Sequence, residues 1–307
     1  MSWGEVKKIN SNMKKPLNIQ MIEQAWAMQI SDASVDWGFR QEGYVGQALW
    51  YYGELWKFAD EDTMEIIVAL PTIDSIVSST IAMDAISAST IAKEAIYASS
   101  LAVAKYACAL AGYDASTVAD MAALAQSSAA MEAVTASTIA MEAVSSSSIA
   151  RTAVLGESAA LKKVQASAMA IGKFAAGCAG LDPSAYKDIA AVASASAAMS
   201  AIAASSTAMS AIAGSTTALN ALYARKKTMK GASANKSGKF IILLISDSNA
   251  FNTSSYGYAT LSDGSKPDWG NYKAKFAYFK QYKKYATYMK NDTDSDDYIE
   301  YFDISNP

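Results

Sequence analysis

The side chains in this chain best suited to chemistry are acidic ones near its C-terminal end. Asp292, Asp294 and Asp296 alternate in the stretch NDTDSDDYIEYFD, and Asp303 follows eleven residues after the first of them. This spacing is similar to that of a calcium-binding loop, which holds the ion with carboxylates at alternate positions and at the twelfth. However, the sixth position is Asp297, where such a loop needs glycine, and the last ligand is Asp instead of Glu. The pattern therefore favours a solvated acidic loop, and we expect no metal and no cofactor.

A second candidate site consists of aromatic residues that lie close to carboxylates in the sequence. The four aromatic residues are Tyr256, Tyr258, Trp269 and Tyr272. Flat rings beside acidic groups suit the faces and hydroxyls of sugars. Aromatic residues of a small domain more often belong to its core, and both interpretations stay open.

The composition argues against catalysis. The chain has no histidine, which excludes Ser-His and Cys-His nucleophile pairs, His-ligated zinc and the usual general base near neutral pH. Cys108 and Cys178 stand alone on Ala-rich stretches and are typical of small core residues. Adjacent carboxylates such as Glu61 and Asp62 have no nucleophile motif or phosphate loop nearby. We therefore predict that the protein is not an enzyme.

Residues 72–230 are repetitive on two scales. Ala/Ser-rich blocks recur with a period of ten, and a larger, 68-residue unit recurs once. The larger unit places Lys105 in register with Lys173, and the stretch AKYACALAGYDAS in register with GKFAAGCAGLDPS. Repeats of this kind indicate a stacked architecture.

A period of ten fits one continuous helix poorly. At about 100° per residue, ten residues fall roughly 80° short of three turns, so the apolar stripe would drift around the helix. Interrupting the helix at each Ser/Thr cluster removes this conflict, because serine and threonine cap helix N-termini. We expect a solenoid of short helices, and a long helical stalk in an oligomer is the alternative.

The longer element within each 68-residue unit carries its own signals for the end of a helix. Gly112 and Gly180 are expected to be left-handed caps, and Asp114 and Asp182 are expected to cap the helices that follow. We interpret these four residues as structural, since they recur at equivalent places in the repeat.

The segments on either side of the repeats differ from it. Residues 1–71 hold five of the six tryptophans and are predicted to form an aromatic docking module. Residues 231–239 are predicted to be a linker, and 240–307 a small α+β domain. In that domain we expect a buried strand from Phe240, a hairpin with its turn near Asp263 and Gly264, and a helix through Tyr278 to Met289.

Charge patterning gives no nucleic-acid or membrane partner. The net charge is −3, and the lysines between 273 and 290 alternate with aromatics as on the wet face of an amphipathic helix. The uncharged run from Ile189 to Leu222 is long enough to cross a bilayer, but it is rich in Ser and Thr. Its equivalent in the preceding copy of the repeat is charged, so we expect no membrane span.

The opening residues, MSWGEVKKINSNMKKPLN, resemble the start of structural proteins from tailed bacteriophages of Gram-positive hosts. The matching residues are Trp3 to Ser11, Pro16 and Leu17. The Ala-Ser-Ser-Thr-Ala-Met decamers are similar to repeats in phage tail-fibre and baseplate-associated proteins.

This resemblance implies a virion component, made in the host cytoplasm, that joins other virion proteins and its own copies. Docking is expected at the N-terminus, through Trp3, Glu5, Lys7 and Asn10, and the C-terminal module would face outward to host-surface carbohydrate. Tail fibre, baseplate, collar and head fibre all remain open positions. The alternatives are an enzyme that acts on cell-wall sugar and, third, a membrane-anchored protein.

Overall fold

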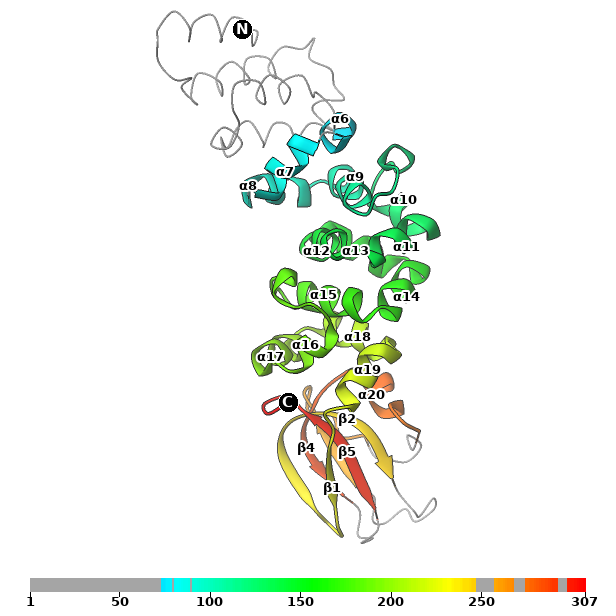
Figure 1. Cartoon of the computed structure of the whole chain (residues 1–307). Helices are drawn as coiled ribbons and strands as arrows, with labels where there is room; N and C mark the ends of the chain where they lie inside the picture. The colour runs from blue at the N-terminus through cyan, green and yellow to red at the C-terminus, as the bar shows by residue number, and fades with distance from the viewer. Residues whose placement is uncertain (1–72, 79, 89, 247–256, 268–273, 292–296) are drawn as a thin grey trace, which may run out of the picture. The chain divides into compact units, whose positions relative to one another are not determined.

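The computed structural model describes residues 73–78, 80–88, 90–246, 257–267, 274–291 and 297–307 (Figure 1). Most of this part is helical, and a small antiparallel sheet lies near the C-terminus. The expected mainly α class with strands in the C-terminal part is therefore confirmed. The aromatic module expected over 1–71 lies outside the described residues. Internal contacts divide the chain into two compact units, Met1–Glu157 and Ser158–Pro307, and the division falls inside the repetitive region.

The first unit consists, where it is described, of short helices joined by tight breaks. They are α6 (Ile73–Ser78), α7 (Thr80–Ala88), α8 (Thr90–Tyr97), α9 (Ser100–Leu110), α10 (Met121–Gln126), α11 (Ser128–Ala136), α12 (Thr138–Ser146) and α13 (Ser148–Gly156). A 3₁₀ turn, Ala115–Thr117, lies between α9 and α10. Helices three places apart pack together, as α9 does with α12 and α10 with α13 (Figure 1).

A single serine separates α11 from α12 and α12 from α13. At Ser137 the backbone is extended, with φ −95° and ψ 120°, so α11 stops there. The Oγ atom of Ser137 then accepts the backbone N–H of Ala140 and caps α12, and Ser147 does the same for α13. These breaks agree with the expected interruption of the helix, because serine competes with the helix for the backbone N–H groups that a helix leaves without partners.

The core of the helices comes from fixed places in each block. In eight of the described helices, the third residue after the break is a buried alanine. These alanines are Ala130, Ala140, Ala150, Ala160, Ala170, Ala198, Ala208 and Ala218. The seventh residue is a larger buried hydrophobe, such as Val144 or Ile212. A small residue and a large one, four positions apart on one helix face, let neighbouring helices approach closely and still fill the space between them.

The second unit continues with the same kind of helix. Its helices before the sheet are α14 (Ser158–Ala166), α15 (Ala168–Cys178), α16 (Ile189–Ala193), α17 (Ser196–Ala204), α18 (Ser206–Gly214) and α19 (Thr216–Tyr223). A 3₁₀ turn, Pro183–Ala185, follows α15. As in the first unit, helices three places apart pack together: α15 with α18, and α16 with α19.

The uncharged run of the sequence is divided among α16 to α19. In the part of the chain that the structure describes, no single helix is long and apolar enough to cross a membrane. The pair α17 and α18 meets the length and composition only when the two are counted together, and they are bent by 104° at the break between them.

The C-terminal part of the second unit is a five-stranded antiparallel sheet with the strand order β1-β5-β2-β4-β3. The strands are β1 (Lys227–Lys230), β2 (Asn235–Ser246), β3 (Tyr258–Leu261), β4 (Ala286–Lys290) and β5 (Tyr298–Asp303). A short helix, α20 (Ala277–Tyr282), contacts β2 (Figure 1).

The sheet curls around its own core. Met229 from β1 and Leu261 from β3 belong to one buried cluster, although these strands form opposite edges of the sheet. Two register shifts in β2 favour the bend, because an extra residue in one strand increases its local twist. At the first shift, a Cβ on Gly238 would lie 2.4 Å from Cζ of Phe240, so only glycine lets this ring fold over the strand.

The linker expected over 231–239 is wrong. β2 begins at Asn235, where it pairs with Lys290 of β4, so only residues 231–234 connect β1 to β2. The Lys-, Gly- and Ser-containing stretch looks like a linker locally. It becomes a strand because its partner is supplied by a segment more than fifty residues later.

The single helix expected through Tyr278 to Met289 is also wrong. α20 ends at Tyr282, the next residue has left-handed φ of 55°, and Met289 lies on β4. The turn near Gly264 is present, with φ of 82° and its N–H bonded to the Leu261 carbonyl. The Leu261 N–H donates to the Ser265 carbonyl across this turn, but the strand that pairs with β3 is β4, and no strand follows the turn within the described residues 262–267.

Candidate functional site

The strongest pattern in the structure is a set of contacts that occurs once in each 68-residue repeat. In the first, Oγ of Ser137 donates to the Leu110 carbonyl at 3.2 Å; in the second, Ser205 donates to the Cys178 carbonyl at 2.9 Å. Each of these serines also caps the helix that follows it. One hydroxyl therefore satisfies an amide at the start of one helix and a carbonyl at the end of another, both of which lack helical partners.

The same relation holds for a second pair of corner serines. Ser147 donates to the carbonyl of Tyr97 at 2.6 Å, and Ser215 donates to that of Gln165 at 2.5 Å. Each bond joins residues fifty positions apart. Both serines are buried, so each bond joins helices that are distant in the sequence and lies away from water.

The expected caps lie where the sequence places them. Gly112 and Gly180 follow α9 and α15 with φ of 67° and 73°, the left-handed region that favours glycine. Oδ1 of Asp114 accepts the N–H of Ser116 at 2.9 Å, and Asp182 accepts the equivalent N–H at 2.8 Å. The helical segments that they cap are single 3₁₀ turns.

Two buried lysines have a role that was not predicted from the sequence. Nζ of Lys105 bonds to the Asp74 carboxylate and, at 3.4 Å, to the Ala115 carbonyl. Nζ of Lys173 bonds to the carbonyls of Pro183 and Tyr186, at 3.2 and 3.1 Å. Each lysine thus holds the loop after its helix. The signal was available, because a lysine recurs at the equivalent position of both repeats within an otherwise apolar Ala-rich stretch.

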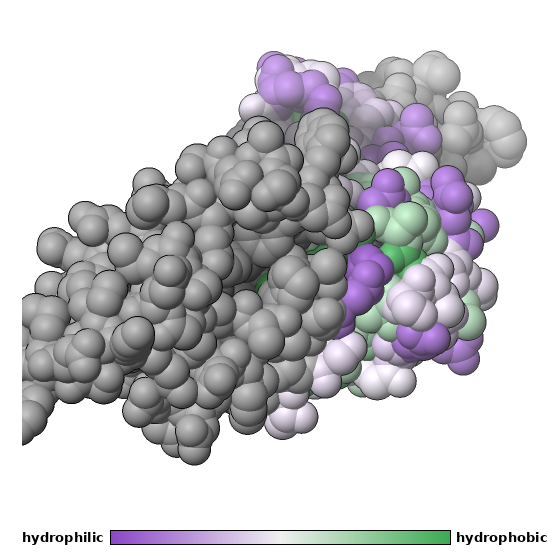
Figure 2. Space-filling view, turned by 90° about the horizontal axis from the view of Figure 1, so that it is seen from above, coloured by the Kyte–Doolittle hydropathy of each residue, from purple (hydrophilic) through white to green (hydrophobic). Residues whose placement is uncertain are grey.

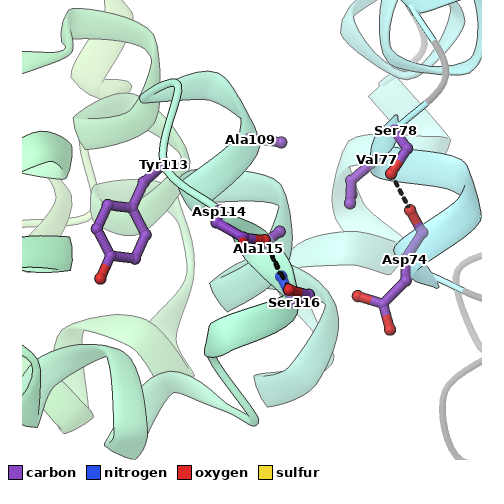
Figure 3. Close-up of a pocket in the computed structure, with 8 residues that line it drawn as sticks. All are labelled: Asp74, Val77, Ser78, Ala109, Tyr113, Asp114, Ala115 and Ser116. Atoms are coloured by element: carbon purple, nitrogen blue, oxygen red, sulfur yellow. Dashed lines mark hydrogen bonds between the residues drawn. The ribbon is translucent and has the colours of Figure 1, made fainter.

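A polar hollow of about 300 Å³ lies beside this loop in the first unit (Figure 3). Its walls are Asp74, Val77 and Ser78 of α6, Ala109 of α9, and Tyr113, Asp114, Ala115 and Ser116 of the loop. Figure 3 shows α6 on one side and the loop on the other.

Both carboxylates of the hollow have structural partners. Asp74 pairs with the buried ammonium of Lys105. Hydrogen bonds from the side chain and then the backbone of Ser116 hold the pKa of Asp114 below its usual value. A carboxyl group that stays ionised is a poor proton donor near neutral pH, so Asp114 lacks the raised pKa that a general acid needs.

A second cluster joins the last helix of the repeats to the sheet. Oη of Tyr223, at the end of α19, donates to Glu300 of β5 at 2.6 Å and accepts from Lys226 at 2.8 Å. Lys226 also pairs with the buried Glu300 carboxylate. Nζ of Lys275 lies 3.5 Å from the centroid of the Tyr223 ring, and Phe276 meets this ring edge-on. These contacts fix α19 against the sheet, and sequence reasoning did not predict them.

Of the four aromatic candidates, only Tyr258 lies within the described residues. It is half-buried on β3, and its ring centroid is 5.8 Å from that of Tyr288 on β4. Tyr256, Trp269 and Tyr272 lie outside the described residues. The pairing with Tyr288 was missed, because that residue had been assigned to a helix.

Of the four acidic candidates, only Asp303 lies within the described residues. Asp303 accepts from Lys227 at 3.4 Å and from the backbone N–H groups of Ser305 and Asn306, so it closes the end of β5. Asp292, Asp294 and Asp296 lie outside the described residues. Among the residues that are described, no cluster of three metal-binding side chains occurs.

The proposed docking residues Trp3, Glu5, Lys7 and Asn10 also lie outside the described residues. On the described surface that Figure 2 shows, small apolar patches alternate with polar ones. Ile139 and Ile149, each directly after the first residue of its helix, are the large hydrophobic side chains exposed in the described part of the chain.

No protein-family model matches the chain, and no curated protein matches it. The functional proposal therefore rests on the residues and their geometry.

Proposed function

We propose that this chain is a non-enzymatic structural protein of a tailed-bacteriophage virion. Its Ala/Ser decamers form a solenoid scaffold built from two 68-residue units, and the scaffold carries the C-terminal sheet. The N-terminal segment docks onto other virion proteins and onto further copies of the chain.

One observation carries the scaffold proposal: the same side-chain bonds recur in both copies of the repeat. Corner serines 137 and 147 bond to the carbonyls of Leu110 and Tyr97, and their equivalents 205 and 215 repeat both bonds. The bonds join helices that are distant in sequence, so each coil is held to the next by more than apolar contact. Alanine and serine lose little side-chain entropy on folding, which suits a rigid structure made of many small side chains.

The sheet is attached to the scaffold by a rigid junction and not by a linker. Tyr223 and Lys226 both bond to Glu300, and the Phe276 ring meets the Tyr223 ring edge-on, with the ring centroids 5.8 Å apart. Removing a buried carboxylate from such a network is costly, because its partners lose their bonds. A module held in this way keeps its orientation to the last helices, as a presented surface requires.

The assignment to a virion is supported by the N-terminal motif around Trp3 and by the decamer composition. The assignment as non-enzymatic is supported by the partners of the carboxylates. Asp74 and Glu300 pair with lysines, and Asp114 caps a turn. An enzyme that acts on wall sugar would need a pair of carboxyl groups free for acid–base work.

The test is made on purified particles of the phage that encodes the chain. Mass spectrometry of particles from a density gradient should find its peptides, and antibody raised against the purified folded chain should label one fixed position in electron micrographs. Particles from a phage with the gene deleted are the control. A chain present in the lysate but absent from the particles would refute the proposal.

Docking polarity is tested with two truncated chains. A chain without residues 1–18 should be missing from particles, and a chain without residues 227–307, which removes the whole sheet, should still be incorporated. The reverse result would show that the sheet is the attachment site.

A further inference from the structure

One face of the sheet carries polar and aromatic side chains where the opposite face carries the core. Strand pairing places Lys290 opposite both Tyr258 and Asn235, and it places Tyr288 opposite both Thr260 and Ser237. Directly paired residues point to the same side of a sheet. These six residues of β2, β4 and β3 therefore form two parallel rows across one face, which we call the tyrosine face.

The alternating residues of the same strands confirm which side this is. Ala259 pairs with Met289, and both are buried in the core cluster. Lys236 also pairs with Met289, and its Nζ donates to Tyr301 of that cluster at 2.9 Å. Because side chains alternate along a strand, the tyrosine face is the side of the sheet turned away from this core.

The tyrosine face is accessible, and most of its polar side chains have no partner within the described chain. Asn235 and Ser237 are exposed, and Tyr258, Thr260 and Tyr288 are partly exposed. The side chains of these five residues make no hydrogen bond to the rest of the described chain; the Thr287 hydroxyl bonds only to the backbone carbonyl of Thr260. The two tyrosine rings lie 5.8 Å apart, tilted by 39°, so their faces form one uneven platform.

We propose that the tyrosine face binds a carbohydrate chain made of hexopyranose units. Three strands about 4.8 Å apart, with same-side residues about 7 Å apart along each, make a surface of roughly 10 Å by 7 Å. That area fits one or two sugar rings. A sugar has an apolar face that stacks on an aromatic ring and hydroxyls that need partners at its rim, and the tyrosine face offers both.

The chemistry favours a sugar over a protein partner or a lipid. Proteins bury larger apolar surfaces in specific interfaces, whereas here two rings are surrounded by amide, hydroxyl and ammonium groups. The charge of the region also suits wall glycans, which are often acidic. Residues 225–307 contain 13 Lys and Arg against 9 Asp and Glu, a net charge of +4, while the whole chain has −3.

This inference goes beyond the proposed function, because it holds whether or not the chain belongs to a virion. Its experiment uses the full chain and two insoluble probes, protein-free Gram-positive cell-wall sacculi and cross-linked dextran beads. Sedimentation is measured in 0.5 M NaCl, which screens non-specific attraction between lysines and acidic polymers. The chain should sediment with at least one of the two probes.

Three variants locate the binding surface. Tyr258→Ala and Tyr288→Ala should each weaken binding at least tenfold, while Tyr288→Phe, which keeps the ring, should stay within threefold of the natural chain. Ser237→Glu adds bulk and charge at an exposed position and removes no packing, so it should also weaken binding at least tenfold. This variant tests the same surface if either alanine variant is poorly folded. Tyr186→Ala, at a partly exposed tyrosine outside the sheet, is the matched control and should bind normally.

Failure to sediment with either probe would overturn the proposal. Retention of full binding by folded Tyr288→Ala and Ser237→Glu would also overturn it, since the sugar would then bind elsewhere. Neither result bears on whether the chain is found in particles, so the two proposals fail separately.

Discussion

Removing the hydroxyl of one corner serine should show how much the bonds between sequence-distant helices stabilise the protein. In Ser215→Ala, the amide of Ala218 loses its acceptor at 3.0 Å and the carbonyl of Gln165 loses its donor at 2.5 Å. Ser215 is 1 % exposed, so water replaces these partners poorly. Loss of a helix cap costs about 1 kcal/mol, and an unsatisfied buried carbonyl adds about 1–2 kcal/mol. We expect the free energy of unfolding to fall by about 2–3 kcal/mol.

The measurement combines urea unfolding, followed by circular dichroism at 222 nm, with hydrogen exchange of the Ala218 amide. This amide should exchange faster in Ser215→Ala, because its hydrogen-bond acceptor is removed. Ser147→Ala removes the equivalent bonds in the preceding copy of the repeat and should have a similar cost. Ser206→Ala is the matched control: this exposed serine is the first residue of α18 and caps nothing, so its loss should change stability by less than about 0.5 kcal/mol. Equal effects of Ser215→Ala and Ser206→Ala would refute the reasoning.

Three further predictions follow from packing and burial. Gly172→Ala should lower the free energy of unfolding by about 1–3 kcal/mol, because a Cβ would lie 2.4 Å from the backbone at the start of α16; Gly156→Ala, where a Cβ meets open space, should be neutral or slightly stabilising by the same urea measurement. Ser145→Ala should be neutral or stabilise by up to about 1 kcal/mol in thermal unfolding, since this buried hydroxyl has no hydrogen-bond partner in the described part of the chain and the equivalent residue is Ala213; a loss above about 1 kcal/mol would reveal a missed partner. Burial raises the pKa of Cys108 to about 11, although a nearby lysine partly lowers it. In a chain whose other cysteine is replaced by serine, a thiol reagent at pH 8 should therefore react with Cys108 at least 100-fold more slowly in the folded state than in 6 M urea. Comparable rates in the two states would mean that α9 opens readily.

The predictions from sequence that agree with the structure are those governed by local interactions. Gly112 and Asp114 were assigned as caps from their types and spacing, and they have these roles. The helix breaks at corner serines such as Ser137 followed from the mismatch between ten residues and the helical period. A cap contacts residues two or three positions away, so the information that sets it lies in one short window of sequence.

The sheet and the bonds from corner serines to distant helices depend on residues far apart in the chain. Asn235 lies on a strand because Lys290 pairs with it, and strand pairing likewise places Tyr288 on β4 instead of in the expected helix. Periodicity alone did not reveal either pairing, because an amphipathic pattern over a few residues suits helix and strand alike. The second bond of the corner serine at 215 also needs Gln165, fifty residues earlier. The sequence by itself therefore determined where the short helices begin and end, whereas the tertiary structure alone decided which distant backbone groups they satisfy and which side chains share the tyrosine face.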